Sequence, residues 1–382
     1  MSPNLINTAK LRRNGAVNSS GADVQKKPAA LDFFAGSGLA AEALRRYFSV
    51  VWANDISEKK ALTYRANHPS EAFHLGSITD VIGSQVPSAE LSWASFPCQD
   101  LSLAGNLGGI ESSRSGLVWQ WLRVMDEMAS RPPLVVAENV LGLVSADGGS
   151  HYLALHTALR KRGYKVGAVM LDAAHWVPQS RPRVFVIGVT DNVDTSAFEA
   201  SGPLWCHNAA IQRVAAKANE FVWWRLPEPK PRTIGLEDII DFGAESHAEQ
   251  TREHILGLIP PAHQKRLAMA SNGKPRAFPG YRRMRNGRQV LELRFDDIAG
   301  CLRTPEGGSS RQLLVIARNG NLETRLITIR EAARLMGARE SYRIVGSYND
   351  GYKAMGDAVA VPAVRYLAQH LLSHLAKDVD HE

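Results

Sequence analysis

The sequence lacks long hydrophobic runs and lacks a basic-then-apolar leader at its start. No apolar run reaches the ~18 residues that suggest a membrane span, and the first residues do not form the apolar core of a secretory leader. Hydrophobic residues make up 45% of the 382 residues and charged residues 22%, which is ordinary for a globular protein. We therefore expect a cytoplasmic protein without membrane contact.

Cysteine is also scarce: the chain holds three, Cys98, Cys206 and Cys301, far apart in the sequence. There is no Cys-x-x-Cys pair, so a structural zinc site is not expected, and an odd count does not fit a disulfide framework. We predict no metal site and a reducing compartment. In such a compartment a lone cysteine in a polar loop is a candidate nucleophile.

Acidic residues are fewer than basic ones, 38 against 45, and the formal net charge is +7. Most basic residues are arginine, the side chain suited to bidentate contacts with phosphate and guanine. A GC-rich genome that favours arginine codons would produce the same excess. Nucleic-acid binding and codon bias therefore stand as equal alternatives, because charge informs about partners and not about fold.

The chain changes character after a polar start. Residues 1–27 show no hydrophobic periodicity, so we expect a disordered tail there. Strands and helices alternate over 28–190, which predicts an α/β fold with a doubly wound, mostly parallel sheet. Ligands of such sheets bind outside the carboxyl ends of the strands. The expected strands are 30–34, 50–53, 92–95, 134–137, 167–171 and 184–189, and the expected helices lie near 39–48, 116–129 and 151–162.

The alternation stops after Thr190. Residues 191–320 are rich in proline and irregular, and we interpret them as a separate smaller domain. Residues 325–337 predict a helix with Thr328 as its cap and Glu331 at the capping-box position. A last amphipathic helix is expected over 358–376. Residues 321–376 would thus form a hinge and return to the first domain.

A turn with two glycines, Ala35-Gly36-Ser37-Gly38, joins the first expected strand to a helix. Glycine there lets backbone N–H groups approach a ligand closely, and Asp55 at the end of the next strand suits ribose hydroxyls. Together they predict an adenosine-containing cofactor. The third glycine of the dinucleotide fingerprint is missing, so a plain strand–helix turn with a surface aspartate is the alternative.

Other chemically capable residues also follow or begin strands. Cys98, preceded by proline, is a candidate thiolate nucleophile, although a lone cysteine is more often an inert core residue. Glu138 ends an apolar strand, where desolvation would raise its pKa and let it act as an acid; a solvated helix cap is the alternative. Arg181 and Arg183 alternate at a strand start and could neutralise a substrate charge or belong to an ordinary edge strand.

Taken in order, these segments resemble the motif set of the DNA (cytosine-5) methyltransferases. The resemblance covers about 30–190 and 290–370 and rests on six ordered segments: Asp32 to Gly38, Phe96-Pro97-Cys98-Gln99, Glu138-Asn139-Val140, Gln179 to Arg183, Arg325 to Gly337, and Gly356-Asp357-Ala358-Val359. It implies a modification-type enzyme of bacteria or phages. It also implies the methyltransferase fold that binds S-adenosylmethionine, with 191–320 as a target-recognition domain.

The resemblance implies a covalent mechanism. Cys98 would add to C6 of a cytosine flipped out of a specific double-stranded DNA sequence, which activates C5 for methyl transfer. Glu138 would hydrogen-bond the ring at N3 and the exocyclic amine, and Arg181 and Arg183 would orient the ring and Glu138. The glycine-rich loop 102–116 would close over the base.

It also implies two sets of binding residues. S-adenosylmethionine would be held by Phe33, Ala35, Gly36, Ser37, Gly38, Leu39, Asp55, Ile56, Ser77, Ile78, Pro97, Asp357 and Ala358. DNA would be contacted by Gln99, Ser102, Arg282, Arg283, Arg285, Cys301 and Leu302. The arginines lie in a basic stretch, 274–294, that suits phosphate contacts, with a solvated basic loop as the alternative.

Three positions depart from the family's pattern. Ser77 stands where the family usually has Asp, Asp357 replaces the usual Asn, and Cys301 replaces Thr. The departures leave Cys98 and Glu138 in place, so we expect an active enzyme.

Three rival interpretations remain. A tRNA cytosine methyltransferase would share the scaffold, but its characteristic Cys-Phe-Thr element is absent. A catalytically silent DNA-binding relative would be expected to lose the cysteine or the glutamate. A nicotinamide dehydrogenase would need a catalytic His or a Tyr–Lys arrangement. We expect a monomer that acts on double-stranded DNA, and the family context admits a companion restriction endonuclease.

Overall fold

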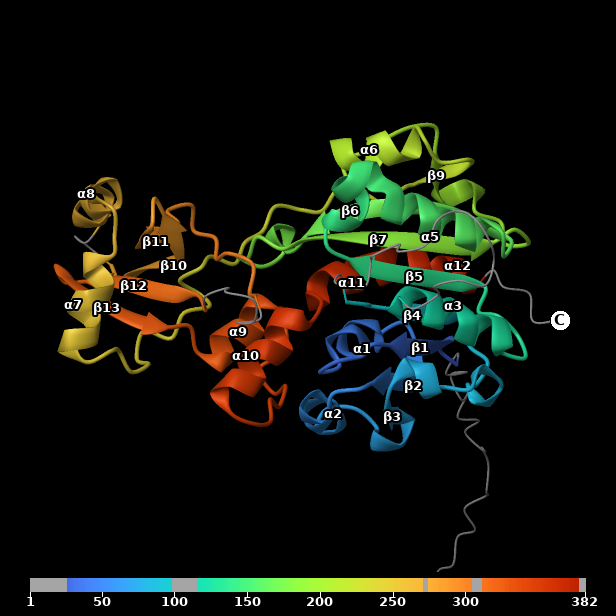
Figure 1. The fold of residues 1–382 in the computed structure, drawn as a ribbon, viewed down its shortest axis with the longest axis horizontal. Coiled ribbons are helices and arrows are strands. Elements are labelled where there is room, and N and C mark those ends of the chain that lie inside the picture. The colour runs from blue at the N-terminus through green and yellow to red at the C-terminus, as the bar shows by residue number, and fades with distance from the viewer. Residues whose placement is uncertain (1–25, 98–115, 271–273, 304–310, 378–382) are drawn as a thin grey trace, which may run out of the picture.

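The computed structural model describes residues 26–97, 116–270, 274–303 and 311–377, which form two lobes of unequal size (Figure 1). The large lobe is built on a nine-stranded sheet and the small lobe on a four-stranded sheet. Within these ranges, no helix combines the length and the apolar character that a membrane crossing requires.

The large sheet has the strand order β3-β2-β1-β4-β5-β7-β6-β9-β8. Its strands are β1 (Ala29–Phe33), β2 (Ser49–Asp55), β3 (Phe73–Leu75), β4 (Leu91–Ala94), β5 (Leu134–Asn139), β6 (Tyr164–Asp172), β7 (Pro182–Thr190), β8 (Glu199–Ala200) and β9 (Phe221–Trp224). Strands β1 to β5 pair in parallel with their neighbours in this group. The mostly parallel sheet is therefore confirmed.

Helices cover both faces of this sheet, so its central strands are apolar on both sides. In β5, Leu134 and Val136 belong to one core, whereas Val135 and Ala137 belong to the other. The first core includes α1 (Leu39–Leu44) and the C-terminal helices, and the second is formed with α3 (Leu117–Glu127), α5 (Ser150–Arg160) and α6 (Ala209–Ala215). The remaining helices of the lobe are α2 (Glu58–Arg65) and the short α4 (Gly142–Ser145).

Strand β7 runs antiparallel to both neighbours, β5 and β6. The chain between β6 and β7 is too short for the crossover that a parallel pair needs, so the two strands form a hairpin-like pair. The start of β7 consequently lies at the same sheet edge as the carboxyl ends of β4 and β5. This reversal brings Arg181 and Arg183 to the edge where the parallel strands end.

The domain boundaries expected at 190 and 320 do not coincide with the limits of the two sheets. Strand β9 pairs in parallel with β6 and buries Trp224, so the large sheet continues to residue 224. At the other end, β13 (Asn321–Leu326) pairs with β12 of the small sheet. The proline-rich composition of 191–320 correctly indicates irregular connections. It does not reveal that β9 still belongs to the large sheet or that β13 belongs to the small one.

The small sheet has the order β11-β10-β12-β13, and all its pairs are antiparallel. Its other strands are β10 (Arg276–Arg285), β11 (Arg288–Leu293) and β12 (Leu313–Arg318). The helices α7 (Glu249–Gly257) and α8 (Pro261–Ala270) lie beside it (Figure 1). Ile255, Phe278 and Val315 contribute to a core separate from those of the large lobe.

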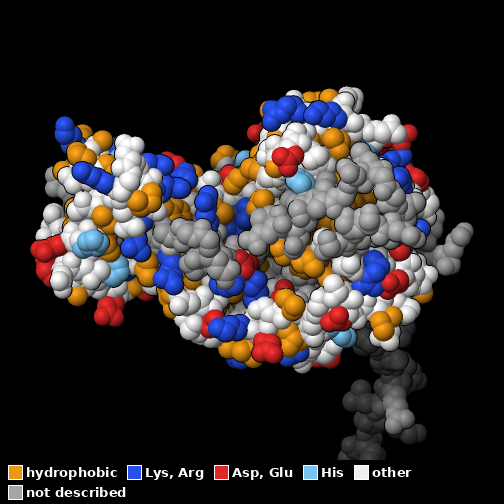
Figure 2. Space-filling view, in the orientation of Figure 1, with side chains coloured by type: hydrophobic (Ala, Val, Ile, Leu, Met, Phe, Trp, Pro, Cys, Tyr) orange, Lys and Arg blue, Asp and Glu red, His pale blue; other side chains and the backbone are white. Residues whose placement is uncertain are grey.

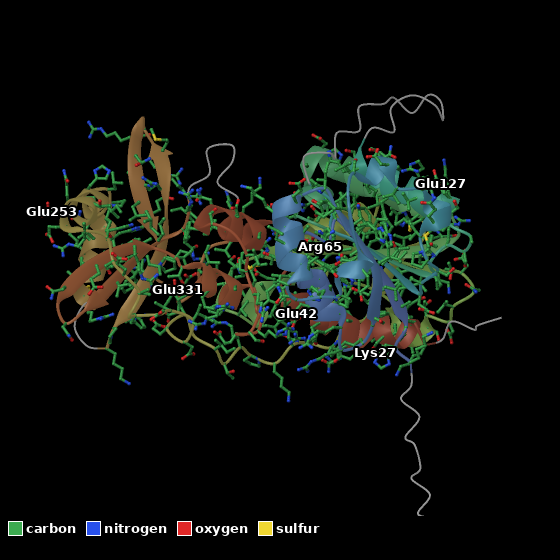
Figure 3. All side chains as sticks on the ribbon, turned by 90° about the horizontal axis from the view of Figure 1, so that it is seen from below. Lys27, Glu42, Arg65, Glu127, Glu253 and Glu331 are labelled. Carbon is green, nitrogen blue, oxygen red and sulfur yellow. The ribbon has the colours of Figure 1, made fainter. Side chains whose placement is uncertain are left out.

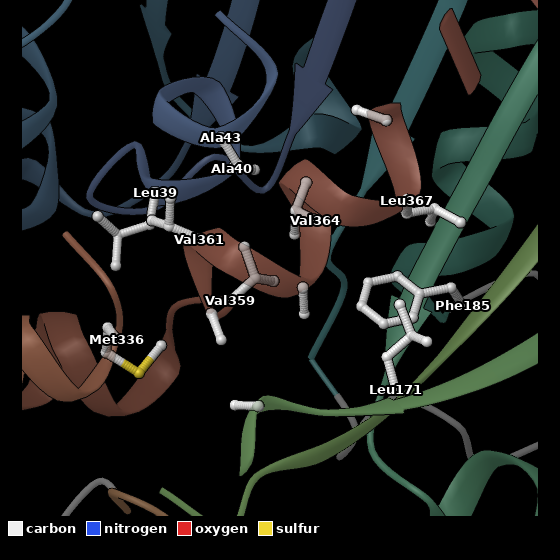
Figure 4. Close-up of a cluster of buried hydrophobic side chains, with 14 of the residues drawn as sticks. Leu39, Ala40, Ala43, Leu171, Phe185, Met336, Val359, Val361, Val364 and Leu367 are labelled. Carbon is white, nitrogen blue, oxygen red and sulfur yellow. The ribbon is translucent and has the colours of Figure 1, made fainter. Parts of the chain in front are cut away.

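The C-terminal segment returns from the small lobe to the large one. It contains α9 (Ile329–Leu335), α10 (Tyr348–Asp357), α11 (Val361–Leu367), a π-helical turn (Ala368–Leu372) and α12 (Ser373–Leu375). Figure 4 shows Val361 and Val364 of α11 close to Leu39 and Ala43 of α1, in one buried cluster. The last helical run begins at Val361, later than expected, because Pro362 occupies its first turn.

Candidate active site

A cleft of about 1630 Å³ lies where the strand ends of the large lobe face the small lobe. Its lining on the large lobe comes from the segments that follow β1, β2, β4 and β5, and from the start of β7. Its opposite wall comes from β10, β11 and α8. In Figure 2 a waist separates the two lobes, and Lys and Arg side chains gather beside it.

The glycine turn after β1 presents its backbone to this cleft. Ala35, Gly36, Ser37 and Leu39 line the cleft as expected. Gly36 has a φ of 55°. Glycine adopts this left-handed backbone conformation readily, whereas most residues with a side chain adopt it only at an energetic cost. The local geometry thus explains the glycine at position 36.

Two residues expected in the lining lie elsewhere. Phe33 is fully buried against Trp52, because side chains alternate along β1, and Phe34 lines the cleft in its place. Gly38 faces inward: a Cβ there would lie 2.7 Å from His68 and 2.9 Å from Tyr64. Close packing against His68 and Tyr64 therefore requires a glycine at position 38.

Asp55, at the end of β2, holds the turn in place. One of its carboxylate oxygens accepts a 2.8 Å hydrogen bond from the Gly36 N–H, and the other accepts one of 2.8 Å from the Ser57 N–H. Asn54 beside it also lines the cleft, a position that the sequence analysis missed. Its signal was the polar pair Asn54-Asp55 that closes the strand.

Ile56, Ser77, Ile78 and Pro97 all line the cleft as expected. Ile56 is 71% exposed, so its side chain offers a free apolar surface beside Asp55. The Ser77 hydroxyl accepts a 3.2 Å hydrogen bond from the Thr79 N–H and caps the short turn that follows. Ser77 thus has a local structural role in addition to its place in the lining.

Asp357 and Ala358 line the cleft from the end of α10. The Asp357 carboxylate forms a 2.8 Å ion pair with the Nζ of Lys60, which lies on α2 and also lines the cleft. Nothing in the local sequence indicates a role for Lys60, because a lysine on a short helix carries no signal of a partner almost three hundred residues away.

Glu138 ends β5 and is buried beside Arg183, whose Nε lies 3.1 Å from a carboxylate oxygen. Burial raises the pKa of Glu138 above its usual range, although Arg183 and then Arg181 oppose the rise. Asn139 follows and donates a 3.0 Å hydrogen bond to the Phe96 carbonyl, which ties the end of β5 to the segment after β4. Glu138 therefore has the environment of a carboxyl group that can hold a proton.

Arg181 is fully buried and binds backbone carbonyls. Its guanidinium donates to the carbonyl oxygens of Gly356 at 2.8 Å, Ala358 at 2.5 Å and Leu302 at 3.1 Å. Burial lowers its pKa to about 10. Arg183 therefore pairs directly with Glu138, whereas Arg181 joins two distant chain segments and acts on Glu138 through its charge.

Cys301 and Leu302 lie in the cleft at this junction. The Cys301 Sγ is 3.2 Å from Arg181 and 4.0 Å from Arg183. Burial opposes ionisation of the thiol, but Arg181 and Arg183 outweigh it and hold the pKa of Cys301 below its usual range. Gln179, absent from the expected site residues, accepts a 3.1 Å hydrogen bond from the Leu302 N–H and helps to place this segment.

The three arginines expected on DNA have different surroundings. Arg283 lines the cleft, and both Arg283 and Arg285 pair with Glu292 of β11 at 3.2 and 2.6 Å. Arg282 alternates with them along β10 and therefore points to the other face. The lining also contains Arg294, the last residue of the expected basic stretch, and four basic residues outside that stretch that the local sequence did not indicate: His263, Arg266, Arg303 and Lys353.

Cys98, Gln99 and Ser102 lie outside the described residues, as does the loop 102–116 up to residue 115. Pro97, directly before Cys98, is the last described residue of that segment and lines the cleft.

Comparison with known proteins gives a family match over most of the chain. The family model described as C-5 cytosine-specific DNA methylase matches residues 29–373. The type II methyltransferase M.Bsp6I of Bacillus sp. (strain RFL6) is 32% identical over 331 residues, 85% of this chain and 91% of that protein. The type II methyltransferase M.HhaI of Haemophilus parahaemolyticus is 25% identical over 352 residues, 90% of this chain and 94% of that protein.

Solved structures share the fold at lower identity. The S. pombe Dnmt2 methyltransferase superposes with a TM-score of 0.59 at 18% identity and covers 93% of this chain and 100% of that chain. An E. coli structure of a putative DNA modification methyltransferase encoded within prophage Cp has a TM-score of 0.57 at 16% identity, covering 92% and 100%. These similarities confirm the expected methyltransferase fold.

Proposed function

Because this chain belongs to the C-5 cytosine-specific DNA methylase family, we propose that it methylates a flipped-out cytosine of duplex DNA through a covalent bond to Cys98. It is a DNA (cytosine-5) methyltransferase, and methylation of cytosine C5 in DNA is the activity of its family. The proposal about Cys98 is supported chiefly by the buried Glu138–Arg183 pair, which lies at the edge where the segment leading to Cys98 leaves β4.

The proposed chemistry begins with the ring, because C5 of cytosine is a poor nucleophile. The Cys98 thiolate adds to C6, and the Sγ–C6 bond makes C5 an enamine carbon. C5 then takes the methyl group. Loss of the C5 proton to a base re-forms the C5–C6 double bond and expels the Cys98 thiolate.

Glu138 is proposed to donate a hydrogen bond to N3 of the ring and to accept one from the exocyclic amine. Addition at C6 pushes electron density toward N3, so a proton held there stabilises the adduct. The raised pKa of Glu138, caused by burial, supports this role. Arg183 fixes the orientation of the carboxyl group through the 3.1 Å contact.

The methyl donor is proposed to be S-adenosylmethionine, which supplies an electrophilic methyl group on a sulfonium. The cleft fits such a group: about 1630 Å³ exceeds the ~1,000 Å³ of a large ligand pocket, which leaves room for a base as well. The surroundings of Gly36 are consistent with this proposal. A Cβ at that position would have no atom closer than 3.8 Å, so a ligand can approach the backbone there. Ile56 and Ile78 would flank the adenine, and Asp55 would reach the ribose.

The small lobe is proposed to recognise the DNA sequence. Its cleft wall carries Arg266, Arg283 and Arg294, which suits contact with phosphates and base edges. Arg181 would fix the position of this wall relative to Asp357 and Ala358, because it donates hydrogen bonds to the carbonyl groups of Leu302 and Gly356. We extend the proposal to a companion restriction endonuclease, because relatives of this chain are named as type II methyltransferases. A monomer stays a prediction.

The first prediction concerns the nucleophile. Cys98→Ser should abolish methyl transfer while duplex binding persists, because the substitution removes the thiolate and leaves the cleft unchanged. Duplex DNA containing 5-fluorocytosine should trap a covalent adduct, since fluorine cannot leave C5 as a proton does. The measurements are incorporation of tritiated methyl groups and a denaturing gel.

Two results would contradict this. A Cys98→Ser variant running near the rate of the unmodified enzyme, or no gel-stable adduct, would remove Cys98 from the mechanism. Label incorporated only into tRNA, when duplex DNA and tRNA are offered side by side, would favour the RNA alternative.

A further inference from the structure

Two consecutive lysines of α2 pair with two aspartates of α10. Lys60 lies 2.8 Å from Asp357, and Lys59 lies 2.7 Å from Asp350. The two pairs differ in position: Lys60 and Asp357 line the cleft, whereas the Lys59 side chain is 73% exposed and outside the lining. Of the two ion pairs, only the inner one, Lys60–Asp357, therefore faces the cleft.

Three other charged groups that line the cleft on the large lobe, Asp55, Glu138 and Arg181, already have proposed roles at the ribose, at the base and between the two lobes. Both oxygens of Asp55 accept backbone hydrogen bonds, and Glu138 is paired with Arg183. Arg181 donates to three carbonyl groups at the junction of two chain segments. Lys60 and Asp357 are a cation and an anion that are both partly open to the cleft, with side chains 19% and 32% exposed.

Their position matches the turn that would receive the cofactor. Lys60 reaches over Gly36: a Cβ on Gly36 would lie 3.8 Å from the Lys60 Cδ. Asp357 is one of the residues that the family resemblance assigns to S-adenosylmethionine, at a position where an uncharged Asn is usual. A lone carboxylate there would repel a carboxylate ligand, and Lys60 offsets that charge.

We propose that Lys60 and Asp357 bind the zwitterionic amino-acid end of the methyl donor, Lys60 its carboxylate and Asp357 its ammonium group. The pair would open around the ligand, and each of the four charges would keep an opposite partner. This inference rests on the proposed use of S-adenosylmethionine and assigns two positioning residues for it.

The test compares two ligands by isothermal titration. S-adenosylhomocysteine carries the amino-acid end, and 5′-methylthioadenosine carries the adenosine without it. Lys60→Met should weaken S-adenosylhomocysteine about tenfold, the scale of one lost charge-assisted hydrogen bond, and should leave the Kd of 5′-methylthioadenosine unchanged. Adding Asp357→Asn to Lys60→Met should recover part of the loss, because the carboxylate that has lost Lys60 no longer repels the ligand's carboxylate.

Lys59→Met is the matched control, since it breaks the outer ion pair between the same two helices. It should change neither Kd. Equal weakening by both lysine variants, or equal loss for both ligands in Lys60→Met, would overturn the proposal and assign the pair to helix packing. If the unmodified protein binds 5′-methylthioadenosine and S-adenosylhomocysteine with no measurable affinity, the proposed cofactor itself fails.

Discussion

Asp32 shows how strongly one position can be shaped by its surroundings. It lies on β1 between β2 and β4 and is fully buried. Burial, followed by the nearby charge of Asp55, raises the pKa of Asp32 to about 8, while the Ala41 N–H favours the charged form. The carboxyl group is consequently protonated in the folded protein at neutral pH, although it would be ionised in the unfolded chain.

This leads to a prediction about pH and stability. Between about pH 4 and pH 8 the folded protein holds a proton on Asp32 that the unfolded chain has lost, so stability falls as pH rises. The contribution of one proton is about 1.4 kcal/mol per pH unit. Asp32→Asn should remove that part of the slope and make the protein more stable at pH 8 than the unsubstituted chain.

Urea unfolding at four pH values across this window measures the slope. Exposed Asp80→Asn is the control and should leave the slope as it is. An Asp32→Asn variant with an unchanged slope would show that the carboxyl group is ionised in the folded protein.

At the scale of elements, α9 begins with a capping box that also anchors a buried ion pair. The Thr328 hydroxyl accepts a hydrogen bond from the Glu331 N–H at 3.1 Å, and the Glu331 carboxylate accepts one from the Thr328 N–H at 2.7 Å. Glu331 also pairs with buried Arg325 at 2.6 Å and accepts from the Asp241 N–H. Figure 3 marks Glu331 between the small sheet and the large lobe, so one carboxylate ties β13 to α9.

The expected costs of two substitutions differ because their partners differ. Glu331→Gln should lower the free energy of unfolding by about 3 kcal/mol, since Arg325 is left charged and buried without its partner. Thr328→Ala should cost only about 1 kcal/mol, the usual loss of a helix cap. Both are measured by urea unfolding. Equal losses would show that Arg325 finds another partner or reaches solvent.

At the scale of the whole molecule, the two lobes form a cleft with arginines on its small-lobe wall, in a chain of net charge +7. Strands β10 and β11 extend from that wall as a hairpin, with Asn286 and Gly287 at positive φ in its turn. A ribbon of this kind can enter a DNA groove. The arrangement predicts an affinity for DNA that falls steeply with salt.

Single substitutions can show which arginines cause the salt dependence of DNA binding. Replacing Arg283 or Arg285 by Gln should reduce the slope of log affinity against log salt by about one each, because each arginine neutralises one phosphate. Arg252 on α7 lies outside the cleft lining and pairs with Glu249, so Arg252→Gln should leave the slope unchanged. Fluorescence anisotropy with a labelled duplex provides the measurement. An equal reduction in all three variants would place the DNA elsewhere.

Much of the element structure followed from local sequence. The apolar runs that became β1, β4 and β5 were recognisable because a strand buried on both faces needs them. Thr328 and Glu331 identified the start of α9, since a capping box involves only four neighbouring residues. The positions of Gly36 and Glu138 at strand ends could be predicted in the same way, because each follows directly on an apolar run in the sequence.

The sequence by itself therefore determined the family, the order of the strands along the chain and the residues at their ends. Only the tertiary structure decided which of those residues meet. The reversal of β7 brought Arg181 and Arg183 to the cleft, where they have different partners, and the packing of α10 on α2 brought Asp357 to Lys60. The physical reason is distance along the chain: periodicity and capping act over a few residues, whereas these partners lie far apart and meet only when the lobes are packed.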